Sequence, residues 1–200
     1  MKSGAAPQSQ LDEDFLRARF YGLLATLLAS PPDGDLLGRL AHLQTDATPL
    51  GKALGTLGAA ARADTTDVDD EFATLFIGVT GGELTPYASW YLTGFLHEKP
   101  LAELRDDMVR LGIEPSPTTA EPEDHAASLC EMMQGLITGL FGAPCPTAEQ
   151  KRFFSRHLGS WLPQFFTDLE DCPSATFYRA VGTLGRVFLE IESQAFAMVD

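Results

Sequence analysis

Three carboxylates and an imidazole stand together in one short segment, Glu121-Pro122-Glu123-Asp124-His125. Carboxylates this close repel one another unless a cation approaches them. A guanidinium group suits the position, because it pairs with a carboxylate through two parallel hydrogen bonds. A simpler interpretation is also open, since proline at a first helical position and acids in the first turn are typical of a helix start. If the segment does chemistry, we expect it to bind a basic ligand.

Metal binding is a less favoured use of the same segment. Glu121 and His125 would share one helix face, and a cysteine could complete a metal site. The sequence supplies no clear third and fourth ligand, and His42, His97 and His157 are scattered along the chain. We therefore expect no bound metal and no cofactor.

The sequence lacks the motifs that mark an enzyme. An active site should show a nucleophile with its base, a metal set or a phosphate loop. Gly78, Gly81 and Gly82 are not followed by Lys-Ser/Thr, so they form no Walker loop, and neither G-x-S-x-G nor H-E-x-x-H occurs. We expect a binding protein and no enzyme, with a cryptic hydrolase or metalloenzyme at the acidic segment as a weaker alternative.

Aromatic residues form a second group of candidates. Helical spacing lets Phe72 and Phe76 share a face, and Tyr87 and Tyr91 likewise. Core packing is the simpler interpretation for the two phenylalanines. For Tyr87, Trp90 and Tyr91 a groove explains the pattern equally well, because these rings tolerate one wet edge.

The charge of the chain restricts its partners. With 14 basic and 28 acidic residues, the net charge is -14, which argues against nucleic acid and anionic lipid surfaces. No Lys or Arg lies between Arg62 and Lys99 or between Arg110 and Lys151, although both stretches are rich in acids. A surface built from them would not repel a basic ligand. Chance clustering on solvated faces explains the same pattern.

Other features concern the compartment. Residues 1–10 carry one Lys and no apolar stretch, so they predict a frayed tail and no secretory signal. No apolar run approaches the ~18 residues that a membrane-spanning helix needs. Cys130, Cys145 and Cys172 are odd in number and lack a zinc-binding spacing, which indicates free thiols in a reducing compartment. We expect a cytoplasmic protein with no integral membrane segment.

Apolar residues recur at helical spacing along most of the chain. The spacing predicts helices over 11–29, 34–44, 49–62, 68–77 and 101–111 and a last helix over 177–195. Pro86 and Pro122 each indicate the start of a further helix, and an amphipathic stretch over 154–165 has a kink or a break at Pro163. We expect an all-α fold, a compact single-domain bundle of roughly eight to ten helices over residues 11–200. The loop 114–120 is the best candidate for a hinge, which would permit either a monomer or a domain-swapped dimer.

Taken together, these segments resemble the TorD/DmsD/NarJ family of redox-enzyme maturation chaperones. The most specific element is E-P-x-D-H, which is matched in full by Glu121, Pro122, Asp124 and His125. The L-F-x-G, P-Y-x-S-x-Y and Q-x-x-F-x-x-x-H-L-x-x-W elements are matched by Leu75, Phe76 and Gly78, by Pro86, Tyr87, Ser89 and Tyr91, and by Gln150, Phe153, His157, Leu158 and Trp161. Each element is weak alone, but four in the same order argue against a chance match.

The resemblance implies a TorD-like, cytoplasmic chaperone that binds the twin-arginine signal peptide of a molybdopterin-containing oxidoreductase and protects the apoenzyme until cofactor insertion and export. It implies a signal-peptide site at Leu75, Phe76, Pro86, Tyr87, Trp90, Tyr91, Glu121, Pro122, Glu123, Asp124 and His125. Asp124, with Glu121 or Glu123, would meet the leader's arginines, and the aromatic residues would take its apolar segment.

The same resemblance leaves the client open. The family's clients include formate dehydrogenases and the reductases of dimethyl sulfoxide and trimethylamine oxide. Guanine nucleotides are a further question, and no phosphate loop is present that would bind one. The alternative function is a general assembly scaffold that binds the mature part of a redox enzyme and ignores its leader.

Overall fold

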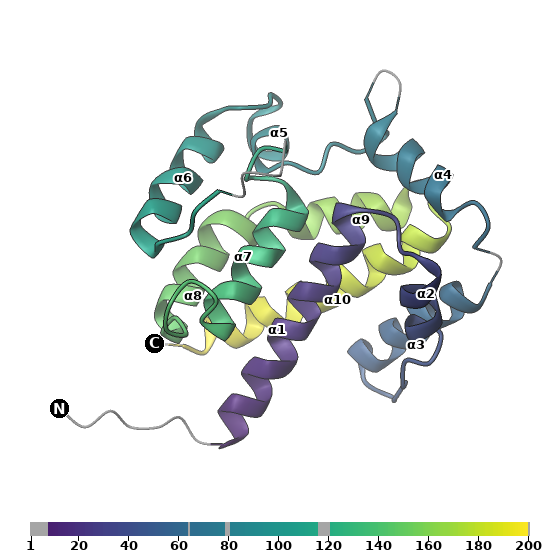
Figure 1. Cartoon of the computed structure of the whole chain (residues 1–200), viewed down its shortest axis with the longest axis horizontal. Helices are drawn as coiled ribbons and strands as arrows, with labels where there is room; N and C mark the ends of the chain where they lie inside the picture. The colour runs from purple at the N-terminus through teal and green to yellow at the C-terminus, as the bar shows by residue number, and fades with distance from the viewer. Residues whose placement is uncertain (1–7, 64, 79–80, 116–120, 200) are drawn as a thin grey trace.

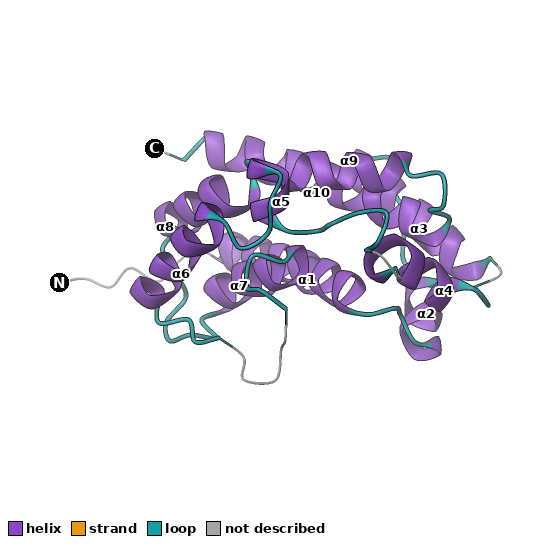
Figure 2. Cartoon of the chain, turned by 90° about the horizontal axis from the view of Figure 1, so that it is seen from above, coloured by secondary structure: helices purple, strands orange, loops and turns teal. Residues whose placement is uncertain are grey.

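The computed structural model shows a helical bundle (Figures 1 and 2). It describes residues 8–63, 65–78, 81–115 and 121–199. Within these ranges there is no β-strand, and the one piece of β pairing is an isolated antiparallel bridge between Tyr87 and His125. The predicted all-α fold is therefore confirmed. None of the described helices is long and apolar enough to cross a membrane.

Three long helices form the centre of the bundle. They are α1 (Gln8–Ala29), α7 (Ala126–Thr138) and α10 (Phe177–Ala197). Helix α1 packs along α7 and also touches α10, while α10 packs against α9 (Leu162–Asp171) and α3 (Pro49–Arg62). These helices bury their apolar stripes against one another, which is the main source of stability in such a fold.

Further helices surround this centre. They are α2 (Gly34–Leu40), α4 (Val68–Phe72), α5 (Ala88–Thr93), α6 (Lys99–Leu111) and α8 (Thr147–Phe153), with π-helical segments η1 (Ala73–Ile77) and η2 (Phe154–Leu158) that continue α4 and α8. The π turn of η1 closes with a bond from the Gly78 N–H to the Ala73 carbonyl, at 2.8 Å. This wider turn leaves Leu75 fully buried and Ile77 61% exposed, so η1 presents apolar surface to solvent.

A buried carboxylate fastens α6 to η2. Asp107 is 3% exposed and accepts hydrogen bonds from His157 Nε2 at 2.8 Å and from Arg156 at 3.0 Å. Burial alone would raise the pKa of Asp107, but the bonds from His157 and Arg110 outweigh it and lower the pKa. The carboxylate therefore stays ionised and compensated, as a buried charge requires.

Several predicted boundaries were wrong for one physical reason. Helix α5 begins at Ala88, not at Pro86, and α7 begins at Ala126, not at Pro122. The Ala88 N–H donates to the Asp124 carbonyl at 3.0 Å, and the Ala126 N–H donates to the Pro86 carbonyl at 2.8 Å. These two chain segments pair with each other in an extended form, so neither can start a helix there.

Other differences are local. Of the kink or break predicted at Pro163 the structure has a break, since η2 ends at Leu158 and α9 begins at Leu162. Pro163 lies in the first turn of α9, where its missing N–H costs nothing. The predicted helix over 34–44 ends at Leu40. Of the predicted tail over residues 1–10, only the last three residues are described, and they begin α1. Most of the predicted hinge, residues 116–120, also lies outside the described residues.

Candidate functional site

The pairing of Pro86-Tyr87 with Asp124-His125 builds the junction between α5 and α7. Asp124 lies on its inner side and is 1% exposed. Its Oδ2 accepts hydrogen bonds from the Ser89 backbone N–H at 2.8 Å and from the Ser89 hydroxyl at 2.5 Å. The carboxylate thereby satisfies an N–H in the first turn of α5, which would otherwise lack a partner.

His125 performs the same task for α7. It is 9% exposed, and its Nδ1 accepts a hydrogen bond from the Ala127 N–H at 3.1 Å. Burial lowers the pKa of His125, and the negative charges of Glu121 and Asp124 oppose that shift only in part. An accepting Nδ1 requires the neutral imidazole with its proton on Nε2. The ring also packs edge-on against Tyr87, with centroids 4.9 Å apart.

The other two carboxylates are less buried than Asp124 and differ in their partners. Glu123 forms an ion pair with Arg105 at 2.7 Å. Burial would raise the pKa of Glu123, but the bonds from Arg105 outweigh it and lower the pKa. Glu121 is exposed and accepts a hydrogen bond from the Tyr87 hydroxyl. Burial and this bond raise the pKa of Tyr87, so the phenol stays a donor. Glu121 is thus the exposed carboxylate of the segment, and no described Lys or Arg forms an ion pair with it.

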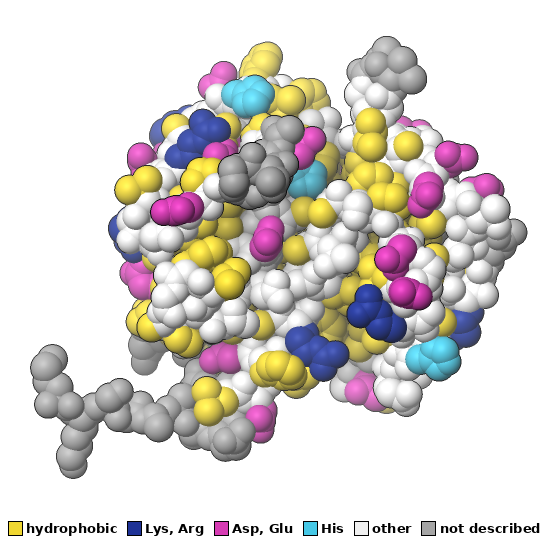
Figure 3. Space-filling model, viewed as in Figure 1, with side chains coloured by type: hydrophobic (Ala, Val, Ile, Leu, Met, Phe, Trp, Pro, Cys, Tyr) yellow, Lys and Arg dark blue, Asp and Glu magenta, His cyan; other side chains and the backbone are white. Residues whose placement is uncertain are grey.

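A groove of about 520 Å³ opens beside this junction; we call it the aromatic groove. Its floor is the C-terminal half of α1, one wall is formed by α4 and η1, and the other wall by the junction and α7. The lining residues are Gly22, Ala25, Thr26, Leu28, Ala29 and Ser30 of the α1 side, Phe72, Phe76 and Ile77, and Tyr87, Glu121, His125, Ala127, Ser128, Glu131 and Gln134. In the space-filling view, hydrophobic side chains gather between the α4 side of this face and its centre, with acidic side chains near them (Figure 3).

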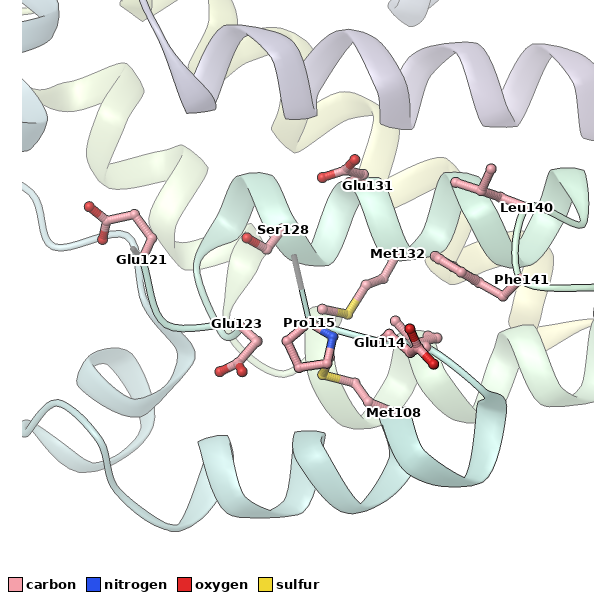
Figure 4. Close-up of a pocket in the computed structure, with 11 residues that line it drawn as sticks. Met108, Glu114, Pro115, Glu121, Glu123, Ser128, Glu131, Met132, Leu140 and Phe141 are labelled. Atoms are coloured by element: carbon pink, nitrogen blue, oxygen red, sulfur yellow. The ribbon is translucent and has the colours of Figure 1, made fainter. Parts of the chain in front are cut away.

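A smaller space of about 150 Å³, the acidic hollow, lies on the other side of α7 (Figure 4). Four glutamates line it, namely Glu114, Glu121, Glu123 and Glu131, together with apolar side chains that include Met108, Met132 and Phe141. Glu121, Ser128 and Glu131 line both the groove and the hollow. We call these three residues the shared rim. The shared rim places the carboxylates of Glu121 and Glu131 at the edge of the apolar surface of the groove.

Metal binding finds no support in this geometry. Among the described residues, no group of three or more His, Cys, Asp or Glu side chains is placed to hold a metal ion. The nearest arrangement to the sequence alternative, Glu121 with His125, uses the imidazole Nδ1 as a helix cap and the carboxylate as an acceptor for Tyr87.

Comparison with known proteins identifies the family. The model of the nitrate reductase delta subunit family, to which TorD and NarJ proteins belong, matches residues 43–167. The chain belongs to this family. The predicted resemblance is therefore confirmed, and the match covers η1, the α5–α7 junction and the groove wall on α7.

The relatives of this TorD-family protein are named chaperones. The chaperone protein TorD of Shewanella loihica is 25% identical over 205 residues, covering 90% of this chain and 92% of that one. The TorD of Actinobacillus pleuropneumoniae is 29% identical over 190 residues, covering 94% and 86%. The TorD of Vibrio atlanticus is 26% identical, but the match spans only 66% of this chain and 65% of that protein, just under two thirds.

A solved structure shows the same fold. The crystal structure of a putative redox enzyme maturation protein from Archaeoglobus fulgidus superposes with a TM-score of 0.60 at 18% identity, covering 94% of this chain and 98% of that one. At this identity the likeness establishes the fold alone.

The structure brings together only some of the residues that the sequence singled out. Phe76, Tyr87, Glu121 and His125 line the aromatic groove, and Glu123 lines the hollow. Leu75, Pro86 and Asp124 are buried, and Pro122 is partly buried at the junction. Tyr91 turns toward α9, where its hydroxyl donates to Asp168 at 2.9 Å. Trp90 is 45% exposed and lines neither space.

The groove and the hollow also use residues of α1 and of the body of α7 that no sequence motif marks. Gly22, Ala25 and Thr26 looked like ordinary positions of an amphipathic helix. Glu114 and Glu131 belong to the stretch without Lys or Arg between residues 110 and 151, which was the available signal. That stretch did not show which acids the fold brings to one place.

Proposed function

We propose that this TorD-family protein is a cytoplasmic chaperone of redox-enzyme maturation that binds the twin-arginine signal peptide of a molybdoenzyme apoprotein. The aromatic groove holds the peptide until the cofactor is inserted and the enzyme is exported. The observation that carries the proposal is the pairing of an apolar wall (Phe72, Phe76, Ile77) with a wall that bears exposed carboxylates (Glu121, Glu131) in one groove. A twin-arginine leader has the matching chemistry, with a basic pair followed by an apolar segment.

Each wall suits one part of such a peptide. Phe76 packs on Phe72 and Tyr178 and still lines the groove, so its ring is held in place before a ligand arrives. An apolar peptide helix can bury its side chains against such a preformed surface. Glu121 can pair with a guanidinium by exchanging its bond to the Tyr87 hydroxyl. The net charge of -14 attracts a basic peptide at low salt.

A scaffold that binds the mature part of a redox enzyme is the second candidate. Trp90, Leu92, Phe95 and Leu96 are 45%, 45%, 69% and 42% exposed and lie on α5 and the turn after it. Exposed apolar residues that gather in one place often mark a protein-binding surface. These residues line neither the groove nor the hollow, so the two candidates predict different effects of mutation.

The test is a calorimetric titration of the purified protein with synthetic leader peptides from formate dehydrogenases and from dimethyl sulfoxide and trimethylamine oxide reductases, each beside a twin-lysine control. We expect micromolar or tighter binding that prefers arginine and weakens with salt. Absence of binding to every leader would sink the proposal. It would leave the scaffold function, which a titration with the leaderless apoenzyme then tests.

A variant that fills the groove locates the site. Thr26 is exposed on α1 and lines the groove. Thr26→Trp should weaken leader binding by roughly tenfold or more, ~1.4 kcal/mol, because the indole occupies space that the peptide needs. Thr56→Trp on α3 is the matched control, since both threonines are exposed and each donates its hydroxyl to the carbonyl four residues back. Equal affinities of the two variants would place the leader outside the groove.

A further inference from the structure

Among the residues that the structure describes, Glu131 has no hydrogen-bond or ion-pair partner, unlike the carboxylates of the E-P-x-D-H segment. It is exposed on α7, and among the described residues it forms no hydrogen bond and no ion pair. Glu123 is already paired with Arg105, and Asp124 is buried against Ser89. Glu131 can therefore bind a cation without breaking any contact to the residues that the structure describes.

Glu131 lies at the border between the aromatic groove and the acidic hollow. Glu131 lies one helical turn beyond Ser128, and both line the aromatic groove and the acidic hollow. Figure 4 shows Glu121, Ser128 and Glu131 following one another from the junction along the first turns of α7. A ligand in the groove would pass Glu121 and Glu131 on the same side, with the apolar wall opposite.

We propose that Glu131 is the second carboxylate of the site and binds whichever arginine of the leader Glu121 does not bind. This inference rests on the proposed function. Two adjacent guanidinium groups bring two positive charges, and Glu121 can form a bidentate pair with only one of them. Glu131 takes the other from farther along α7. The apolar segment of the peptide then lies against Phe76 and Ile77 across the groove.

The floor of the groove is compatible with this arrangement. Ala25 lies between the two walls and carries only a methyl group, whereas the space above Gly22 is filled by the side chain of Gln134. A peptide helix can therefore come close to α1 at Ala25 while its arginines reach the shared rim. The arrangement explains a preference for two adjacent arginines over one, since each has a carboxylate of its own.

The test combines variants of the protein with variants of the peptide. The purified protein is titrated with a leader that has both arginines and with two leaders in which one arginine is replaced by glutamine. The proteins are wild type, Glu131→Gln and Glu190→Gln. Glu190 is exposed on α10 and lines neither the groove nor the hollow. Glu190→Gln therefore removes the same charge as Glu131→Gln, but at a distance from the proposed site.

We expect Glu131→Gln to bind the twin-arginine leader roughly five- to tenfold more weakly at low salt, while Glu190→Gln binds it like wild type. For one of the two single-arginine leaders, Glu131→Gln and wild type should bind equally, because the arginine that Glu131 contacts is missing. Thermal unfolding of each variant checks that the fold is intact.

Two outcomes count against the inference, and they are distinguishable. If wild type binds the twin-arginine leader and Glu131→Gln binds it equally well, or loses the same factor for all three peptides, Glu131 does not read an arginine and the proposed function survives. If wild type binds none of the leaders, the proposed function and this inference both fail.

Discussion

Asp124 and Glu121 stand three residues apart in one segment, but their surroundings are opposite. Asp124 is 1% exposed and satisfies the start of α5 through Ser89. Glu121 is exposed, lines both spaces and, among the described residues, shares its carboxylate only with the Tyr87 hydroxyl. The difference shows that a motif of acids contains two kinds of residue. One kind builds the site, and the other kind is available to a ligand.

The same division separates two regions of the molecule. The inner side of the junction consists of Asp124 and His125, which cap α5 and α7 and fix the angle between them. The outer side is the shared rim, whose carboxylates border the groove. Mutations on the inner side should therefore change the free energy of unfolding, and mutations on the outer side should change peptide affinity.

The largest expected effect is a loss of stability caused by a mutation on the inner side of the junction. Asp124→Ala leaves the Ser89 N–H and hydroxyl buried without their acceptor, which should lower the free energy of unfolding by about 2–4 kcal/mol. Chemical denaturation followed by circular dichroism measures it. Asp106→Ala is the control, since Asp106 is exposed on α6 and its loss should cost less than about 0.5 kcal/mol.

An Asp124→Ala protein with full stability and no leader binding would mean that Asp124 meets an arginine directly, as the family resemblance implies. The junction would then have to open when the peptide binds.

A mutation on the outer side should have a smaller effect, and this effect should be on peptide affinity instead of stability. Glu121→Gln should weaken leader binding by about 1–2 kcal/mol, because a charge-assisted hydrogen bond becomes a neutral one. The free energy of unfolding should change by less than about 0.5 kcal/mol, since the residue is exposed. Calorimetry and denaturation of the same sample check both values. A large loss of stability would show that Glu121 belongs with the inner side.

Much of the bundle could be predicted from sequence because its helices are amphipathic and end at strong signals. Helix α6 ends at Gly112, which adopts the left-handed conformation that favours glycine. Helix α10 follows its apolar stripe from Phe177. For these two helices, local pattern and tertiary packing favour the same structure, and the predicted boundaries agree with the structure to within two residues.

The junction could not be predicted in this way, because local signals and tertiary pairing disagree there. Pro122 and the acids after it look like a helix start, and Pro86 looks like another. Backbone pairing of Pro86 with Ala126 across 40 positions overrides both signals. The ion pairs of Asp107 and Glu123 and the shared rim also depend on contacts between distant segments. A single sequence contains no signal for them.

The smallest expected effect is a dependence of stability on pH, which comes from His125 on the inner side of the junction. Burial lowers the pKa of His125 below its usual 6.5, so the folded protein resists a proton that the unfolded chain accepts. Stability is then fully present above about pH 6.5 and falls as the pH drops below it toward the lower folded pKa. The loss should be at most about 1 kcal/mol, the usual worth of a helix cap. His157 has a pKa lowered by burial as well and contributes in the same direction.

The variant His125→Asn separates the contribution of His125 to this pH dependence from that of His157. Asparagine keeps an acceptor for the Ala127 N–H but does not titrate, so the variant should lose less stability than wild type between pH 7.5 and 5.5. His97→Asn is the control, because His97 is exposed at a positive φ of 61°, which asparagine tolerates. It should follow wild type. If His125→Asn shows the wild-type pH dependence, the imidazole does not act as a neutral cap, and the inner side of the junction does not depend on its protonation.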